Sequence, residues 1–409
     1  MEKEKLIIRN FGPIKNVELD LGRFNILIGE QATGKSTVAK VLAVCRYFSY
    51  IVSSNIESIV PELNQFTNGL NAWGLTEYVK ANSYIFYNCK HYSLIVENEI
   101  VTSHKPFSQF GEDITEDIPV PTAKIQPISP EFANLLLELD KIKPKKTDDP
   151  YGFGEFMWVI PTSFFLNDVK NVMDNPFYMP TQRGLQSIFS LGQNSIQNLS
   201  DALFNQLAKM DGIVRRFTNE TYIEPLDIFY KNVQGHGYVR KANETEYYSL
   251  FNAASGYQSE IPIVLVIKYY NELKKRNKTF LIEEPEQNLF PSAQERLIEY
   301  LVHQTVSFNN SVLLTTQSPY VLTSLNNMMY AYQVGQQRPE QADKVIDKKY
   351  WISADEVSAY RMMNDGTAKD IMDSELKQID AGEVDEVSRI INTEWDKLAN
   401  IEYGRENDN

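Results

Sequence analysis

The feature that most constrains this chain is a short segment that contains two glycines separated by four residues, Gly29-Glu-Gln-Ala-Thr-Gly34-Lys35-Ser36-Thr37. An apolar run at 24–28 leads into it, and apolar residues at helical spacing follow it. This spacing of glycines, followed by Lys and a hydroxyl residue, is the phosphate-binding loop pattern, in which glycines let backbone N–H groups face a phosphate. The sequence therefore predicts a strand, a phosphate-binding loop and a helix, in that order.

The residue types in this loop suit ATP and Mg²⁺. Lys35 can reach the β- and γ-phosphates, and the Ser36 hydroxyl can ligate Mg²⁺. The helix that follows would point its free N–H groups at the phosphates. Its predicted buried face contains Val38, Val41, Leu42, Cys45 and Phe48. The candidate nucleotide-binding residues are Gly29, Gln31, Thr33, Gly34, Lys35, Ser36 and Thr37.

A second apolar run, residues 279–282, ends in the closely spaced acids Glu283, Glu284 and Glu286. Buried carboxylates are costly unless they are paired, hydrogen-bonded or bound to a metal. In phosphoryl-transfer sites one such acid supports Mg²⁺ and another polarises the attacking water. We assign the metal role to Glu283 and the base to Glu284. We also expect the strand to end between them, because Pro285 lacks an N–H group and has a fixed φ.

Two more stretches complete an ordered set. Ser255-Gly256-Tyr-Gln258 opens a run with helical apolar spacing, and a helix N-terminus of this kind is a ready anion site. Residues 311–316 form another apolar strand, which ends at Gln317-Ser-Pro. Each stretch alone is a common helix start or strand end, so the order of all four motifs is the informative feature.

In this order the motifs resemble those of ABC-type ATPases of the SMC and RecF kind. They resemble more closely the stand-alone AAA-family ATPases of the OLD type, many of which occur in bacterial anti-phage loci. The resemblance covers residues 1–50 and 245–330, and Tyr178-Met-Pro-Thr-Gln-Arg183 resembles the family's aromatic-x-Pro-x-x-Arg segment. It implies an α/β P-loop NTPase fold of the ABC-ATPase type, with a mixed central sheet, antiparallel N-terminal strands, a large α/β insertion and no long coiled coil.

The resemblance also implies a mechanism. Two copies would pair head to tail around two ATPs, so a homodimer or a higher homo-oligomer is expected. Ser255, Gly256 and Gln258 of each copy would contact the nucleotide of the other. Gln317 occupies the switch position, which is usually His; it can donate a hydrogen bond but cannot take a proton, so slow turnover is expected.

The sequence departs from the family pattern at other positions too. Gln31 and Ala32 stand where Asn and Gly are usual, and Phe290 stands where His is common before Pro. Prolines between 106 and 180 argue against a long coiled-coil arm. Strands are expected in 83–103 and helices in 131–143 and 194–210. The expected division is 1–50 for the N-terminal half of the ATPase domain, 51–245 for an insertion and helical lobe, 246–335 for the C-terminal half, and 336–409 for a tail with a terminal helix.

Composition limits the remaining choices. The two cysteines are too few for a disulfide framework, and no apolar run is long enough to cross a membrane, so the sequence indicates a cytoplasmic protein. The four histidines are scattered and show no zinc-binding spacing. A net charge of −14 argues against a broad basic surface. Two functions stay open: an ATPase switch controlling a separately encoded effector, such as a nuclease, in anti-phage defence, or a RecF-like DNA-repair ATPase that clamps DNA directly. A transporter subunit is a third and more distant choice.

Overall fold

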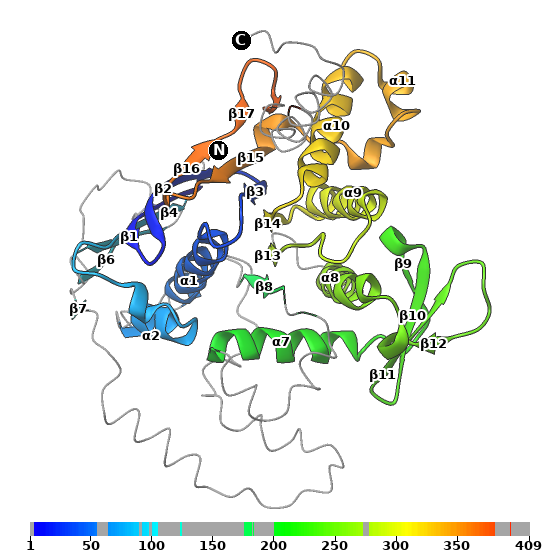
Figure 1. The fold of residues 1–409 in the computed structure, drawn as a ribbon, viewed down its shortest axis with the longest axis horizontal. Coiled ribbons are helices and arrows are strands. Elements are labelled where there is room, and N and C mark those ends of the chain that lie inside the picture. The colour runs from blue at the N-terminus through cyan, green and yellow to red at the C-terminus, as the bar shows by residue number, and fades with distance from the viewer. Residues whose placement is uncertain are drawn as a thin grey trace, which may run out of the picture.

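The computed structural model describes residues 4–54, 64–89, 92–97, 100–104, 123–124, 176–181, 183, 200–272, 278–380 and 393. Within these residues the chain forms two six-stranded sheets, one four-stranded sheet and a two-stranded hairpin. Helices pack beside the sheets (Figure 1), so the chain is a mixed α/β protein, as the sequence predicts.

The central sheet has the order β16-β15-β3-β14-β13-β8. Its strands are β16 (Ala368–Asp370), β15 (Val357–Met362), β3 (Phe24–Ile28), β14 (Ser311–Thr316), β13 (Thr279–Glu283) and β8 (Phe177–Met179). All neighbours pair in parallel except β15 and β16. Strands covered on both faces read as continuous apolar runs, and every residue of β13 is accordingly buried. Because β14 lies between β3 and β13, the ends of these two strands are about 10 Å apart.

The second six-stranded sheet contains the N-terminal strands. Its order is β2 (Ile14–Leu21), β1 (Glu4–Phe11), β4 (Tyr84–Cys89), β5 (Tyr92–Glu97), β6 (Ile100–His104) and β7 (Ala123–Lys124). All neighbours are antiparallel. In β2 the buried residues Val17, Leu19 and Leu21 alternate with exposed ones, which is the pattern of a sheet with one covered face. The predicted antiparallel N-terminal strands are confirmed.

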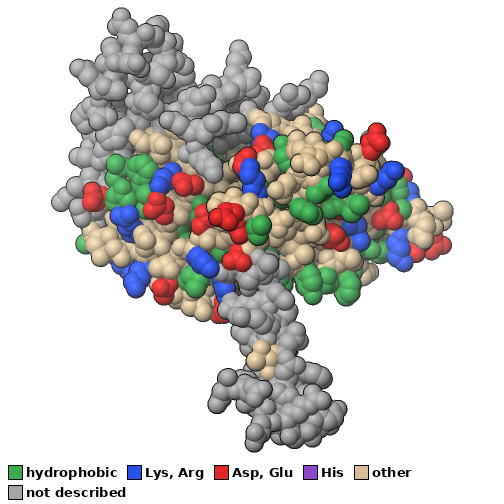
Figure 2. Space-filling view, turned by 90° about the horizontal axis from the view of Figure 1, so that it is seen from above, with side chains coloured by type: hydrophobic (Ala, Val, Ile, Leu, Met, Phe, Trp, Pro, Cys, Tyr) green, Lys and Arg blue, Asp and Glu red, His purple; other side chains and the backbone are tan. Residues whose placement is uncertain are grey.

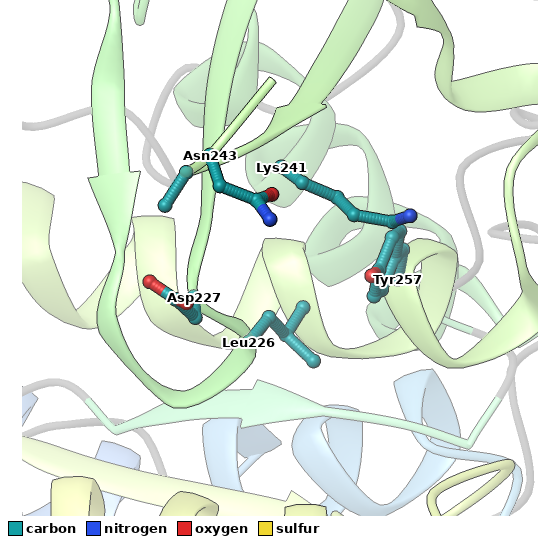
Figure 3. Close-up of a pocket in the computed structure, with 6 residues that line it drawn as sticks. Leu226, Asp227, Lys241, Asn243 and Tyr257 are labelled. Carbon is teal, nitrogen blue, oxygen red and sulfur yellow. The ribbon is translucent and has the colours of Figure 1, made fainter.

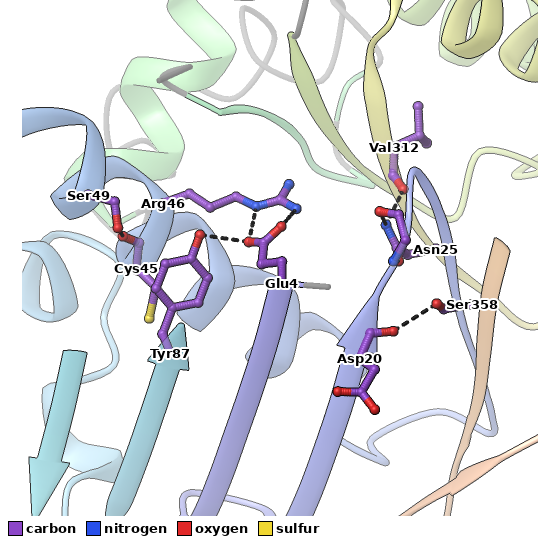
Figure 4. Close-up of polar contacts among 10 residues, drawn as sticks. Glu4, Asp20, Asn25, Cys45, Arg46, Ser49, Tyr87, Val312 and Ser358 are labelled. Carbon is purple, nitrogen blue, oxygen red and sulfur yellow. Dashed lines mark hydrogen bonds and ion pairs between the residues drawn. The ribbon is translucent and has the colours of Figure 1, made fainter. Parts of the chain in front are cut away.

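Helix α1 (Lys35–Ser54) joins the two large sheets. Its predicted apolar face is confirmed, since each of its five residues is at most 2% exposed. In the middle of α1, Arg46 donates to both carboxylate oxygens of Glu4 in β1, at 2.7 and 2.5 Å. The Tyr87 hydroxyl of β4 donates to the same carboxylate at 2.6 Å (Figure 4). The start of α1 is therefore held against one sheet and its middle against the other.

The remaining α-helices among the described residues are α2 (Asn64–Ala72), α7 (Asp201–Val214), α8 (Ser255–Glu272), α9 (Pro291–Phe308), α10 (Pro319–Gly335) and α11 (Pro339–Asp343). A small antiparallel sheet contains β12 (Tyr248–Ser249), β11 (His236–Lys241), β10 (Ile228–Val233) and β9 (Thr221–Ile223), and the hairpin contains β17 (Met372–Asp373) and β18 (Gln378–Ile379). Because α9 follows β13 and α10 follows β14, both helices begin at the edge of the central sheet where its parallel strands end.

The central sheet extends beyond residue 335, where the sequence analysis began a tail. The reason is that β15 pairs in parallel with β3, the strand before the phosphate loop. The domain boundaries themselves stay predictions. Strands in 83–103 are present, and α7 overlaps the helix expected at 194–210. The helix expected at 131–143 and the terminal helix of the tail lie outside the described residues. No helix in the described part of the chain is long and apolar enough to span a membrane.

Candidate active site

The loop after β3 is shaped by close backbone contacts at its two glycines. A Cβ atom at Gly29 would lie 2.5 Å from the Met362 carbonyl oxygen, and one at Gly34, where φ is +93°, would lie 2.5 Å from Ile14 Cδ1. Thr33 Oγ1 donates to the Glu30 carbonyl at 2.9 Å inside the loop. Only glycine fits these two positions without displacing a neighbour. The loop thus has the tight curvature that the sequence pattern predicts.

Lys35 lies at the floor of the loop. Its Nζ donates to the carbonyl oxygens of Gly29 and Glu30, both at 2.6 Å. Burial lowers the pKa of Lys35, while the carboxylates of Glu284, Glu286, Glu283 and Glu30 oppose that shift. The ammonium group therefore faces the acids that follow β13. The next residue, Ser36, is exposed in the first turn of α1, and Thr37 is buried.

The acidic end of β13 lies in the same edge of the sheet. Strand pairing places Glu283 beside Thr315 of β14, and Thr315 beside Leu27 of β3. The strand ends at Glu283, and Glu284 adopts a φ of 42° in the left-handed region. The prediction that the strand ends between the two glutamates is confirmed. Because Glu284 lies outside the strand, the two side chains need not point to opposite faces, as alternation along a regular strand would require.

The two residues predicted to be catalytic are hydrogen-bonded to each other. Gln317 Nε2 donates to Glu284 Oε1 at 2.6 Å. Glu286 ties the same two segments together, because its Oε1 accepts from Thr316 Oγ1 at 2.6 Å and from the Gln317 backbone N–H at 2.9 Å. Burial raises the pKa of Glu286. The sequence analysis gave Glu286 no chemistry, and its position is that of a brace between the ends of β13 and β14.

Glu283 offers a buried oxygen for a cation. Its Oε1 has no hydrogen-bond partner among the described residues, and the same holds for the Tyr178 hydroxyl. Burial, and after it the neighbouring Glu283 carboxylate, raises the pKa of Tyr178. An unpaired buried carboxylate oxygen is costly, and a cation would relieve that cost. Mg²⁺ is commonly held by one or two protein oxygens together with substrate phosphates and water, so Glu283 and Ser36 fit it.

The start of α8 packs on the turn after the acids. A Cβ atom at Gly256 would lie 2.8 Å from the Asn288 carbonyl oxygen, and Ser259 Oγ donates to the Gln287 carbonyl at 3.0 Å. Ser255 is exposed. In the described part of the chain no hydrogen bond joins Ser255 or Gly256 to the phosphate loop. Ser255 and the loop are thus not linked by hydrogen bonds within one chain.

Gln258, a predicted nucleotide contact, has another partner in this structure. Its Nε2 lies within hydrogen-bond distance of the carbonyl oxygens of Leu250, Phe251 and Ala253, at 3.0–3.3 Å. It thereby caps the short turn Leu250–Asn252 that precedes α8. Its role toward a nucleotide stays a prediction, and so does that of Gln31, which is exposed in the loop.

A cavity of about 530 Å³ lies behind the start of α8, between that helix and the small sheet. Figure 3 shows Lys241 and Tyr257 on one side of it and Asp227 and Asn243 on the other. None of the residues predicted from the sequence to bind a nucleotide or to act in catalysis lines this cavity. The candidate active site is therefore the open edge of the central sheet.

The sequence analysis missed Asn364. Its Nδ2 donates to Glu30 Oε2 at 3.0 Å, and the Gly366 carbonyl accepts from the N–H groups of Lys15 and Asn16. The turn between β15 and β16 thus reaches both the phosphate loop and the turn between β1 and β2. The run Asn364-Asp-Gly366 is a readable hairpin signal, but nothing in it indicates which loop it contacts.

Comparison with known proteins gives one informative match. The AAA ATPase domain model matches residues 166–322, which include Ser255, Glu283, Glu284 and Gln317. Residues 166–322 therefore resemble an AAA ATPase domain. Binding and hydrolysis of ATP are the activities expected of such a domain. No curated protein matches the chain.

Three solved structures are similar in fold at low sequence identity. They are the SMC head domain from Thermotoga maritima (TM-score 0.39, 11% identity, 91% of this chain and 98% of that chain), an SmcHead bound to the C-winged helix domain of ScpA (0.40, 10%, 91% and 97%), and an Smc head domain with an extended coiled coil bound to the C-terminal domain of ScpA from Pyrococcus furiosus (0.38, 9%, 95% and 98%).

Proposed function

We propose that this protein is an ATP-hydrolysing molecular switch in which two copies close over ATP and Mg²⁺. The observation that carries the proposal is the hydrogen bond between Gln317 and Glu284, at the end of β13 and one strand away from the phosphate loop. A general base and its orienting partner are thereby held at the edge where Lys35 faces the same acids.

Each residue has a separate task in this proposal. Lys35 exchanges its bonds to two backbone carbonyls for bonds to phosphate oxygens. Ser36 and Glu283 would hold Mg²⁺, which would supply positive charge to neutralise the phosphates. Glu284 accepts a proton from water as the water oxygen bonds to the γ-phosphorus and the bond to the leaving ADP oxygen breaks. Gln317 orients the Glu284 carboxylate but cannot accept a proton, so turnover is slow.

The exposed residues at this edge support a second copy as the partner. Among the described residues, Ser255 is exposed and makes no hydrogen bond to the phosphate loop of its own chain. Three aromatic side chains lie exposed beside the starts of α8, α9 and α10: Phe251 is 65% exposed, Phe290 77% and Tyr320 52%. Apolar side chains gathered around a functional edge mark a contact surface. A second copy would cover them and bring its Ser255 and Gly256 to this chain's nucleotide.

The cellular role is proposed from the resemblance of the motifs. The ATP-bound dimer would act in the cytoplasm on a separately encoded effector in anti-phage defence. The alternative is a RecF-like ATPase that clamps DNA. On the face in Figure 2, basic side chains are scattered among acidic ones. DNA clamping predicts ATP-dependent DNA binding that weakens steeply with salt, whereas the effector model predicts co-purification with the product of a neighbouring gene.

Complementation between inactive variants tests the composite site. Lys35→Ala and Ser255→Arg proteins should each be inactive alone. Heterodimers purified through two different affinity tags contain one site with both groups intact and one with neither, so they should regain ATPase activity that neither parent protein has. Purified heterodimers without any activity would overturn the shared site.

A further inference from the structure

Arg183 is a fully buried arginine that donates to four backbone carbonyls and, among the described residues, to no carboxylate. Its Nη1 donates to Glu283 O at 2.5 Å and to Pro180 O at 3.1 Å, and its Nη2 donates to Glu284 O at 2.6 Å. Its Nε donates to Ser259 O at 2.9 Å. One planar group thus holds the turn after β8, both acidic residues and the first turns of α8.

Burial of the Arg183 guanidinium group is energetically costly. Burial lowers the pKa of Arg183 to about 10, against the carboxylates of Glu286, Glu283, Glu284 and Glu260, which raise it. A guanidinium placed inside a protein is stabilised only when its donors are satisfied. Its rigid fork of donors fixes the directions of the acceptors around it, which an ammonium group on a flexible stem cannot do.

The acceptors are the backbone groups that set the catalytic geometry. Glu284 has a φ of 42°, and its carbonyl is held by Arg183 and by the N–H of Gln287. Gln287 in turn accepts from Ser259 Oγ, so Ser259 is bound to the acidic turn through its hydroxyl and to Arg183 through its carbonyl. A shift of α8 therefore cannot leave the Glu284 backbone unaffected.

We propose that Arg183 is a positioning residue for hydrolysis, which couples the start of α8 to the backbone of Glu284 in the same chain. The inference rests on the proposed function, in which Ser255 and Gly256 at the start of α8 serve the nucleotide of the second copy. Contact of α8 with that nucleotide then moves Glu284 of its own chain into place. Arg183 is the group through which each site of the dimer senses the other.

The first experiment separates positioning from folding and needs no dimer. Arg183→Lys keeps the charge but replaces the planar fork with one nitrogen that carries three donors. We expect ATP affinity within about threefold of wild type and kcat reduced about 100-fold, the loss that a misplacement of about 1 Å can produce. The measurements are nucleotide titration, steady-state ATPase kinetics and the melting temperature.

Arg46→Lys is the matched control. Arg46 is also a buried arginine, 7% exposed, but it binds Glu4 and lies away from the acids. This variant should lose stability and keep its kcat. Equal loss of kcat in both variants, or an unchanged kcat for Arg183→Lys in a protein whose wild type hydrolyses ATP, overturns the positioning role. Failure of the wild-type protein to hydrolyse ATP would contradict the proposed function. Failure of the positioning role is seen only in a wild-type protein that does hydrolyse ATP, so the two results are distinguishable.

The second experiment tests the coupling with tagged heterodimers. Paired with a Lys35→Ala chain, a chain with an intact loop supplies the loop and acids of the one working site, and its own α8 faces a site without nucleotide. Coupling predicts that a wild-type chain in this pairing hydrolyses ATP at least tenfold more slowly per working site than the wild-type homodimer does. An Arg183→Lys chain, whose acids no longer respond to α8, should show the same rate per working site in the homodimer and in this pairing. No slowing of the wild-type chain, or equal slowing of both chains, overturns the coupling and leaves Arg183 acting on its own acids.

Discussion

The phosphate loop and the acidic turn after β13 lie one strand apart, yet they are held in different ways. The loop is shaped largely by its own residues: Lys35 binds Gly29 and Glu30, and Thr33 binds Glu30. The acidic turn is held by distant residues, namely Arg183, Thr316 and Gln317. One half of the site is therefore a local motif, and the other half is a product of tertiary structure.

The difference predicts separable defects. Changes in the loop should act on nucleotide binding, because the proposed function gives the loop residues bonds to the nucleotide phosphates and none to the reacting water. Changes in the acidic turn or its supports should act on kcat, because those residues orient groups around the reacting water. The four predictions below are ordered from the largest effect to the smallest. Glu284→Gln and Lys35→Ala test this division in activity, and Glu260→Gln and Ala32→Gly test stability near each half.

Glu284→Gln should give the largest loss. The amide preserves size and hydrogen bonding to Gln317 but cannot accept a proton, so kcat should fall by roughly 10²–10⁴-fold. ATP affinity should remain close to wild type, and the ATP-bound dimer should accumulate on size-exclusion chromatography. Hydrolysis at the wild-type rate would assign the base elsewhere. A raised Mg²⁺ requirement in Glu284→Gln, with the slow phenotype in Glu283→Gln, would exchange the two roles.

Glu260→Gln should change how stability depends on pH. Glu260 is fully buried beside Ser259, and burial raises its pKa from 4.5 to about 8 although Arg296 and Arg183 oppose that shift. Between these values the folded chain keeps a proton that the unfolded chain has released, so the free energy of unfolding falls as pH rises from 4.5 to 8. The full loss is on the order of 5 kcal/mol, and a neutral Gln escapes it.

Urea unfolding at pH 5 and at pH 8.5 measures this effect. The variant should match wild type at pH 5 and exceed it at pH 8.5. An identical difference between the two proteins at both pH values would show that Glu260 does not titrate in this range.

Lys35→Ala should act on binding. In the proposed function the substitution removes a buried cation from beside the phosphates, and a hydrogen bond to a charged group contributes about 1.5–3 kcal/mol. ATP affinity should therefore fall roughly 10–100-fold in a nucleotide titration. Unchanged ATP affinity together with unchanged kcat would remove the phosphate-loop assignment. Unchanged ATP affinity with a lower kcat would contradict the proposed division between the two halves.

Ala32→Gly should give the smallest effect. Ala32 has a φ of 62° in the phosphate loop, a conformation that costs an L-residue about 1–2 kcal/mol. Glycine adopts it freely but loses more chain entropy on folding, by roughly 0.5–1 kcal/mol. The net gain in unfolding free energy should be about 0.5–1 kcal/mol, with ATP affinity and kcat unchanged. A loss of stability would mean that the alanine methyl group makes a contact of its own.

The sequence was informative where the structure is local. The strand, loop and helix around Gly34 and the end of β13 at Glu283 could both be read from residue types in order. The partners of Glu284 and Glu286 could not, because hydrogen bonds between residues 30 to 100 positions apart leave no periodicity. Arg183 was visible in a motif, but its four acceptors are backbone carbonyls, which every residue has.

The place of β15 in the central sheet was not predicted, for a related reason. Strand β15 is short, and its place beside β3 depends on parallel pairing across most of the chain. Parallel strands need a crossover connection, so their neighbours are not indicated by nearby turn residues. Composition therefore could not show that residues 357–362 complete the sheet.

The position of β3 has a consequence for synthesis of the chain. This strand, at 24–28, pairs on one side with β14, which begins at residue 311, and on the other with β15, which begins at residue 357. At about 5–20 residues per second, a ribosome needs roughly 15–60 seconds to reach β14 after making β3. During that interval both edges of an apolar strand await their partners, and unpaired edges of this kind invite aggregation. The nascent chain therefore needs a chaperone at its N-terminus more than a chain with local sheet pairing does.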